Sequence, residues 1–245
     1  VALANLLPTE AEVDELDSFC FQTVGHNVVS AYATCCGLPL FRRRFSGEAK
    51  QTGMAYSETK GDEVEDLFLL LKAVKKRIPE VQAVSSGAIA SDYQRLRVEE
   101  VCSRLGLLSL AYMWHQPQAK LLRQMCAAGI QAVLIKVAAI GLDPTKHLGK
   151  SLAEMEAHLH SLQRKYDVNV CGEGGEYETL TLDCPLFTQA RIKLTETEAV
   201  HDSQGGMLKI RRFELERKQG APPDASAAEV IDVTGDAMGD APVTV

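Results

Sequence analysis

The chain has 245 residues, of which 46% are hydrophobic, and a formal net charge of −7. This length can bury one large core, or one core with a small satellite. The negative charge argues against a general nucleic-acid binder, because neutralising phosphates requires a basic face. No run approaches the roughly 18 apolar residues of a membrane helix, and no signal-like segment opens the chain. The seven cysteines show neither a Cys-x-x-Cys pair nor zinc spacing, which favours reduced thiols in the cytoplasm.

The chain opens with a predicted strand and a predicted helix. Residues 1–6 form a short aliphatic run that is typical of a buried strand. From about Glu15 to Cys35 the apolar residues keep helical spacing, and Gly37 supplies the stop. His26 lies off this apolar stripe, so it is expected to be solvated or to cap the helix.

The next segment predicts a strand, a loop and the clearest helix of the chain. Residues 38–45 can form a strand, with Pro39 at a sheet edge or at the strand start. Residues 46–60 have no period and are expected to form a loop. The helix from about Gly61 to Ile78 carries acids in its first turn and basic residues near its last, as the helix dipole prefers. Its charges are therefore mainly structural.

The middle of the chain predicts alternating strands and helices. The expected elements are a strand at 81–89, a helix from Ser91 to about Leu105, a strand at 108–114, a helix from Pro117 to Gly129, a strand at 130–140, a polar loop at 141–150, a helix after Ser151 and a strand at 168–171. The run 130–140 is continuously apolar, which is typical of a strand covered on both faces. Lys136 interrupts this run and must pair or extend toward solvent, because burying a lone ammonium is costly.

Residues 170–187 have the most unusual composition. They hold three glycines, four carboxylates and an apolar alternation that continues as a strand. One interpretation is a plain hairpin with solvated acids. The other is a binding segment, because acids on a mere turn have no reason to gather around an aromatic residue and two threonines. In an extended segment, one face would carry Tyr177, Thr179, Thr181 and Asp183.

The end of the chain predicts two strands and a tail. Residues 190–195 and 207–216 alternate enough to form a small antiparallel end piece. From about Lys218 onward the residues are small and acidic and have no period, which is typical of a disordered linker.

The repeated strand–helix units indicate an α/β fold with a doubly wound, mostly parallel sheet. In such sheets ligands bind beyond the carboxyl ends of the strands. Polar or glycine-rich clusters follow several expected strands, at Asn5, 87–92, 141–143 and 172–178. Their convergence predicts a binding site at that edge.

Five sets of residues together resemble one known family. They are Gly61-Asp-Glu-Val-Glu-Asp-Leu67; Gly87-Ala-Ile-Ala-Ser-Asp-Tyr-Gln-Arg95; Leu110-Ala-Tyr-Met-Trp114; Gly141-Leu-Asp143 with His147-Leu-Gly-Lys150; and Cys171-Gly-Glu-Gly-Gly-Glu-Tyr-Glu-Thr179 with Leu182-Asp-Cys-Pro-Leu-Phe187. On these motifs, and over about residues 1–217, the chain is similar to the diphthine–ammonia ligases. The resemblance implies an HUP-like ATP-pyrophosphatase fold with a small C-terminal α+β portion. It divides the chain into a nucleotide-binding domain at 1–139, a substrate-binding portion at 140–217 and a linker or tail at 218–245.

The resemblance also implies a reaction and its partners. Members of the family use ATP to adenylate the diphthine carboxylate on translation elongation factor two, and ammonia then displaces AMP to give diphthamide. The implied cofactor is ATP with Mg²⁺, and the implied partners are the diphthine-bearing factor and ammonia, with neither a membrane nor nucleic acid. Such an enzyme is expected in the cytoplasm.

Adenylation needs cationic groups near the phosphates, and amidation needs an anionic or basic pocket for ammonia. The expected catalytic residues are Glu173, Glu176, Glu178 and Lys150. The expected nucleotide-binding residues are Asn5, Leu6, Gly87, Ser91, Asp92 and Lys136. The expected substrate-binding residues are Gly172, Gly174, Gly175, Tyr177, Thr179 and Asp143. Among these, Tyr177 is proposed to bind the trimethylammonium group of diphthine through its aromatic face.

One departure from the family pattern keeps other functions open. The family begins with a strand and a Ser-Gly-Gly-Lys-Asp-Ser loop that cradles the ATP phosphates, and neither this pattern nor Gly-x-x-x-x-Gly-Lys-[Ser/Thr] occurs in the 245 residues. The chain is therefore expected to lack that strand and loop, and to be inactive as it stands. A nucleotide-binding module without catalysis and a protein that only recognises the elongation factor are the alternatives.

Overall fold

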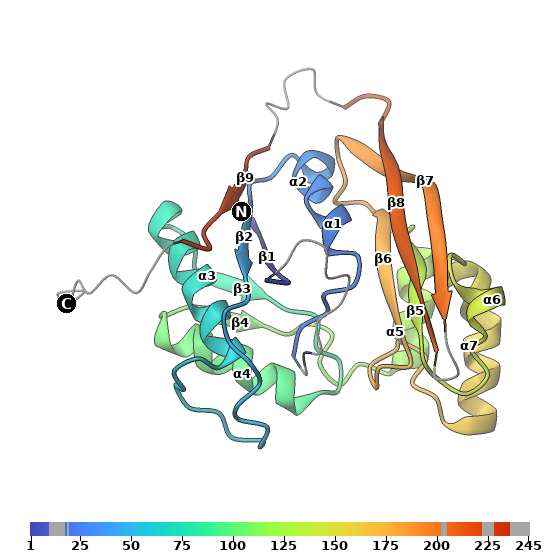
Figure 1. The fold of residues 1–245 in the computed structure, drawn as a ribbon, viewed down its shortest axis with the longest axis horizontal. Coiled ribbons are helices and arrows are strands. Elements are labelled where there is room, and N and C mark those ends of the chain that lie inside the picture. The colour runs from blue at the N-terminus through green and yellow to red at the C-terminus, as the bar shows by residue number, and fades with distance from the viewer. Residues whose placement is uncertain (10–17, 19, 202–204, 222–227, 236–245) are drawn as a thin grey trace.

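A computed structural model describes residues 1–9, 18, 20–201, 205–221 and 228–235, and it places parallel strands beside a separate antiparallel sheet (Figure 1). The parallel strands form two sheets, ordered β1-β2-β9 and β3-β4, and the antiparallel sheet has the order β6-β5-β8-β7. The strands are β1 (Leu3–Leu7), β2 (Leu40–Arg44), β3 (Ala83–Ser85), β4 (Leu108–Leu110), β5 (Gln131–Val137), β6 (Tyr177–Asp183), β7 (Ala190–His201), β8 (Gly206–Arg217) and β9 (Val230–Asp232). The predicted α/β class is confirmed.

The helices lie on both sides of the molecule, with α3 and α4 near the parallel strands and α5, α6 and α7 beside the antiparallel sheet (Figure 1). They are α1 (His26–Val29), α2 (Ala31–Cys36), α3 (Glu63–Arg77), α4 (Asp92–Arg104), α5 (Gln118–Ala127), α6 (Pro144–His147) and α7 (Leu152–Tyr166). The one-turn helix α6 lies within the segment expected to be a loop. The sequence Ser151-Leu-Ala-Glu154 indicates a capping box, and the structure has it: the Ser151 hydroxyl accepts from the Glu154 amide while the Glu154 carboxylate accepts from the Ser151 amide.

The long helix predicted before Gly37 is confirmed for its second half, which forms α1 and α2 and ends at Gly37, and is wrong for residues 20–25. Residues 10–17 and 19 lie outside the described residues, and residues 20–25 are not helical. Gly25 has a left-handed φ of 79°, and a Cβ there would lie 3.1 Å from Ile135 Cδ1. Glycine therefore lets the backbone turn tightly against β5 before α1 begins.

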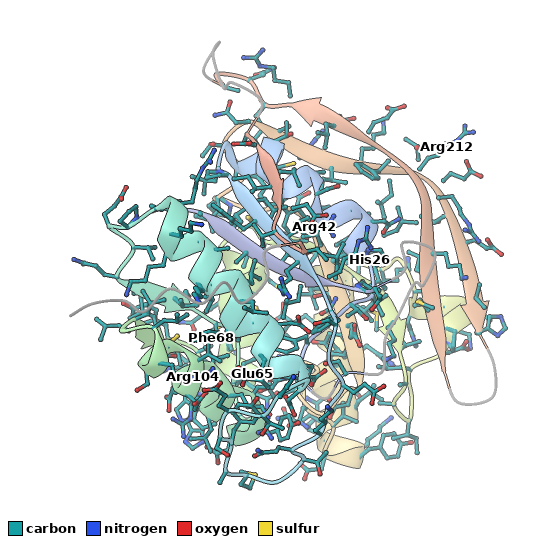
Figure 2. The ribbon with its side chains drawn as sticks, turned by 60° about the vertical axis from the view of Figure 1, so that its left-hand side comes forward. His26, Arg42, Glu65, Phe68, Arg104 and Arg212 are labelled. Carbon is teal, nitrogen blue, oxygen red and sulfur yellow. The ribbon has the colours of Figure 1, made fainter. Side chains whose placement is uncertain are left out.

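The expectation that His26 is solvated is also wrong. Its side chain is buried, and its carbonyl accepts a hydrogen bond from Arg42 Nη2 at 2.8 Å. Figure 2 shows His26 and Arg42 near each other. The turn at Gly25 brings His26 inward, which helical periodicity could not indicate.

The strand predicted at 130–140 does not join a parallel sheet. It forms β5, which pairs antiparallel with β6 and with β8. The strand predicted at 168–171 is absent from the described residues, where Val168 and Val170 are buried in a loop that follows a left-handed Asp167. Burial explains the apolar pattern of both segments, but the pattern does not report the direction of pairing.

The tail predicted to be disordered contains a strand. Residues Val230–Asp232 form β9, which pairs in parallel with β2, and Val233 is buried in the same apolar cluster as Phe41. Residues 222–227 and 236–245 lie outside the described residues. The prediction of disorder is therefore wrong for β9, because a three-residue strand inside a polar, small-residue context leaves little periodic signal.

The largest apolar cluster joins the helices α1 and α2 to the antiparallel sheet. Val28 and Cys35 pack with Ile135 of β5 and Leu180 of β6. A second cluster packs α7 against the same sheet through Met155 and other buried residues. In the part of the chain that the structure describes, no helix is both long enough and apolar enough to cross a membrane.

A polar cluster joins the last residue of α4, Arg104, to the first turn of α3. Arg104 donates to both carboxylate oxygens of Glu65 at 3.0 and 2.8 Å, and its guanidinium lies 4.1 Å from the centre of the Phe68 ring. Figure 2 shows the three side chains together. Burial opposes the ionisation of Glu65, but the hydrogen bonds from Arg104 and Tyr56 outweigh it and lower the pKa of this carboxyl.

Candidate functional site

The loop that follows β3 meets the turn before β6, residues 172–176, which carries Glu173 and Glu176 and is called the acidic turn below. Glu173 Oε1 accepts hydrogen bonds from the backbone amides of Ile89, Ala90 and Ser91 at 2.8, 2.7 and 3.1 Å. The Ile89 carbonyl in turn accepts from the His115 amide at 2.8 Å. The expectation that the cluster at 87–92 and the cluster at 172–178 converge is therefore confirmed, and they do so beyond the carboxyl ends of β3 and β4.

The loop after β3 enters α4 through a well-formed cap. Ser91 is the N-cap residue, and its hydroxyl accepts from the Gln94 amide at 3.3 Å. Asp92 in the first turn lies 3.0 Å from Arg95. Gly87 is exposed at the entrance of this loop, and a Cβ there would make only an ordinary contact with Met113. Gly87, Ser91 and Asp92 thus all belong to the loop after β3 and the first turn of α4.

The loop after β4 adds an aromatic stack that sequence reasoning treated as strand. The rings of Trp114 and His115 are stacked with centroids 4.3 Å apart, and the Arg95 guanidinium lies 4.6 Å from the Trp114 centroid. His115 has a φ of 53°, which is uncommon outside glycine and asparagine. Pro117 was the available signal, because it restricts Gln116 directly before it and marks a break between the strand and α5.

Glu176 stabilises the acidic turn through hydrogen bonds to both of its carboxylate oxygens. Its Oε1 accepts from the amide and side-chain nitrogens of Asn169 at 3.0 and 2.7 Å, and its Oε2 accepts from the Gly174 amide at 2.7 Å. Gly172 and Gly175 take left-handed φ values of 75° and 80° in the same turn. The contacts of Glu176 are those of a residue that stabilises a turn, and its catalytic role stays a prediction.

Glu178 faces the lysine that interrupts the apolar strand. Its Oε1 lies 3.3 Å from Lys136 Nζ, across the antiparallel pair of β5 and β6, and both side chains are partly buried. The expectation that Lys136 must pair or extend to solvent is confirmed. The proposed phosphate contact of Lys136 would compete with this ion pair.

Tyr177 and Thr179 lie on β6, away from open solvent. Tyr177 is only 4% exposed, and its hydroxyl donates to the Val170 carbonyl at 2.5 Å. Burial raises the pKa of this phenol. Thr179 is partly buried, and its carbonyl accepts from Gln22 Nε2 at 3.1 Å. The structure leaves Tyr177 no open ring face, so its contact with a trimethylammonium group stays a prediction without structural support.

Replacing Tyr177 by phenylalanine should lower the free energy of unfolding by about 1–3 kcal/mol, because the buried Val170 carbonyl loses its donor. We expect the binding of nucleotide and of protein substrate to change little. Urea denaturation measures the first effect, and titration calorimetry measures the second. Loss of protein-substrate binding in a variant of normal stability would return Tyr177 to a role in recognition.

Asp143 and Lys150 make their side-chain contacts within their own loop and helix. Asp143 caps α6 through the Thr145 amide at 2.9 Å and lies 2.6 Å from Lys146, and these contacts lower the pKa of its carboxyl. Lys150 is half-exposed and lies 3.2 Å from Glu154. The structure does not join these two residues to the acidic turn through their side chains.

Asn5 and Leu6 lie on β1. The Asn5 Oδ1 accepts from Arg42 Nε at 3.0 Å, and Leu6 is 5% exposed within the apolar cluster around Phe41. In the described ranges, no group of three or more His, Cys, Asp or Glu side chains is placed to hold a metal ion. A magnesium site made of protein side chains alone is therefore not seen among the described residues.

The parallel strands, with polar loops at their carboxyl ends, define an α/β protein whose candidate ligand site lies at that edge of the sheet. The family model of the diphthamide synthase N-terminal domain matches residues 9–109, and that of the C-terminal domain matches residues 117–215. The chain therefore belongs to the diphthamide synthase family, as its motifs indicate.

Three relatives that align with more than 90% of this chain are named diphthine–ammonia ligases. A mouse (Mus musculus) diphthine–ammonia ligase is 54% identical over 239 residues, which cover 94% of this chain and 89% of the relative. A human (Homo sapiens) protein of the same name is 52% identical over 230 residues, with coverages of 91% and 86%. A Schizosaccharomyces pombe protein of that name is 50% identical over 224 residues, which cover 91% of this chain but 36% of that longer protein.

The predicted division of the chain near residue 139 stays a prediction. The strand β5 lies before that position, yet it pairs with β6 and β8, which lie after it.

Proposed function

We propose that this chain is an ATP-dependent ligase that amidates diphthine to diphthamide on translation elongation factor two. The observation that carries the proposal is the identity of 54% with a diphthine–ammonia ligase across both matched domains. In the proposed reaction, a diphthine carboxylate oxygen bonds to the α-phosphorus of ATP, the bond between the α- and β-phosphates breaks, and pyrophosphate leaves. The nitrogen of ammonia then forms the C–N bond, AMP leaves with the former acyl oxygen, and the nitrogen releases a proton.

The proposed nucleotide-binding segment is the loop between β3 and α4. This loop offers an exposed glycine at Gly87, a capped helix start at Ser91 and a carboxylate at Asp92. Backbone amides at such a start suit an anionic ligand, although here they bind Glu173. We propose that Mg²⁺ arrives with the ATP phosphates, since this ion is usually held by one or two carboxylates together with phosphate oxygens.

Glu173 and Glu176 of the acidic turn and Glu178 of β6 differ in what they can offer a cationic ligand. Both oxygens of Glu176 accept backbone or amide hydrogens, and Glu178 faces Lys136. Glu173 uses Oε1 for three backbone amides, and within the described residues its Oε2 accepts no hydrogen bond. We therefore propose Glu173 as the acid that can hold ammonium or a substrate cation through Oε2.

The proposed partners are ammonia and an elongation factor that carries diphthine, and the proposed location is the cytoplasm. Two observations support them. Both matched domains of the family are present, and all seven cysteines are free thiols, as a reducing compartment favours. The alternative of a relative without catalysis is not favoured, because the identity to ligases extends over both domains.

The test is amide formation by the natural full-length protein. Incubation with ATP, an ammonium salt and diphthine-bearing elongation factor should yield AMP, pyrophosphate and the amide, which mass spectrometry of the modified peptide detects. Omission of ammonium and use of an unmodified factor are the controls. Tight ATP binding without amide formation, in the presence of all substrates, would instead favour the nucleotide-binding alternative.

A further inference from the structure

Glu173 connects two segments that are far apart in the sequence. It belongs to the region matched by the C-terminal family model, whereas Ile89, Ala90 and Ser91 belong to the region matched by the N-terminal one. The hydrogen bonds between them span 82 to 84 positions of the chain. One carboxylate oxygen thus joins the acidic turn to the loop that begins α4.

The three hydrogen bonds to Glu173 Oε1 favour one conformation of the loop at 89–91. Three consecutive backbone amides form a concave anion-binding arrangement, and the N-terminus of α4 adds its dipole. Hydrogen bonds to an ionised acceptor are stronger and shorter than neutral ones. The Ile89 peptide is also held on its other side, because its carbonyl accepts from the His115 amide. The conformation of the loop at 87–91 therefore depends on Glu173.

The acidic turn is itself stiff enough to transmit this dependence. Glu176 brackets the turn through Asn169 and Gly174, and Asn169 Oδ1 accepts from Gln118 Nε2 at 3.0 Å. The turn is thereby tied to the start of α5. A displacement of the turn would reach the loop after β3 through the Glu173 side chain, whose Oε1 contacts all three amides directly.

We propose that Glu173 is a positioning residue. It sets the conformation of the loop at 87–91, which is the proposed nucleotide-binding loop, and so aligns that loop with the acidic turn. This role rests on the proposed ligase function, in which the two sides must present the activated carboxylate and the ammonia to each other. Oε1 carries the positioning contact. Alignment of the reacting groups is worth large rate factors, so a loosened loop costs turnover even when substrates still bind.

The experiment compares Glu173→Ala with Glu173→Gln in the full-length protein. The glutamine keeps a carbonyl oxygen that can accept from the three amides, and the alanine removes it. In Glu173→Ala we expect the amides of residues 89–91 to exchange with deuterium about 10- to 100-fold faster, and turnover to fall by about 100-fold. Glu173→Gln should retain most of the protection, and acetate should restore part of it to Glu173→Ala. Glu198→Ala, on the exposed strand β7, is the matched control.

A large loss of turnover in Glu173→Gln with unchanged exchange would overturn the positioning role in favour of the cation contact of Oε2. Unchanged exchange in Glu173→Ala overturns the contact itself. Faster exchange with turnover and KM values of the unchanged enzyme overturns the positioning role and leaves a merely structural one. The exchange measurement needs no catalysis, so a failure of the ligase assay for the unmodified protein would refute the proposed function without affecting the test of the contact.

Discussion

Replacing Asp66 by alanine is expected to lower the free energy of unfolding by about 3–5 kcal/mol, because it leaves a buried guanidinium without its counter-ion. Asp66 is 1% exposed and Arg43 is 5% exposed, and Arg43 Nε lies 3.0 Å from Asp66 Oδ1. The same carboxylate accepts from the amides of Ser46 and Gly47 at 2.7 and 2.9 Å. Its loss should therefore also release the loop after β2. Chemical denaturation measures the change.

An exposed ion pair provides the matched control for Asp66. Glu196 and Arg212 pair at 3.2 Å on the long hairpin of β7 and β8, and Figure 2 shows Arg212 at the surface. Removal of Glu196 should change stability little, because exposed pairs are screened by water. Equal effects of Glu196→Ala and Asp66→Ala would contradict the importance of burial. The three consecutive arginines at 42–44 all bond to other parts of the chain, and Arg43 is buried, so this basic segment stabilises the fold.

Gly172→Ala is expected to reduce turnover by about 100-fold, because a displacement of about 1 Å at a reacting group can cost that much. Gly172 has a φ of 75°, and a Cβ there would lie 2.6 Å from the carbonyl oxygen of Tyr177. The backbone must shift to accept the methyl group, and Glu173 is the next residue. Steady-state kinetics with saturating ATP and ammonium measures the loss, and far-ultraviolet circular dichroism confirms that the variant is folded.

Gly175→Ala separates backbone strain from steric clash. Gly175 has nearly the same φ, 80°, but no atom lies within 4 Å of a Cβ placed there. It should lose about 1–2 kcal/mol of stability from the left-handed conformation alone, with a smaller effect on turnover. If the two variants lost turnover equally, the contact with the Tyr177 carbonyl would not explain the effect of Gly172→Ala.

The parts of the fold that follow from local chemistry were predictable. The acids at the start of α3, the cap at Ser91 and the capping box at Ser151 each place a helix correctly, because the signals lie within one turn of the helix end. The direction of β5 was not predictable, because it depends on the path that the chain takes through α6 and α7 before returning as β6. The strand β9 was missed because its stability comes from pairing with β2.

The candidate site divides in the same way. The expected convergence of polar clusters beyond the strand ends is seen for 87–92 and 172–178, although no strand forms at the described residues 168–171, and these contacts do not include Asn5 or Asp143. The separate roles of the acids could not be read from spacing, because each role depends on a partner from elsewhere: Asn169 for Glu176, Lys136 for Glu178 and three amides for Glu173. Tyr177 was expected to face a ligand because a period of two assigns it to a face without telling which face is covered.

The pairing of β9 with β2 has a consequence for the order of folding during synthesis. Arg43 Nη1 donates to the Val233 carbonyl at 3.0 Å across 190 positions of the chain, and the Val233 amide donates to the Arg42 carbonyl. The ribosome synthesises the chain from its N-terminus at about 5–20 residues per second. The edge of β2 must therefore wait unpaired for roughly 10–40 s until β9 has been made. During that interval the nascent sheet is open to pairing with other chains, so a chaperone that shields this edge should increase the yield of native protein.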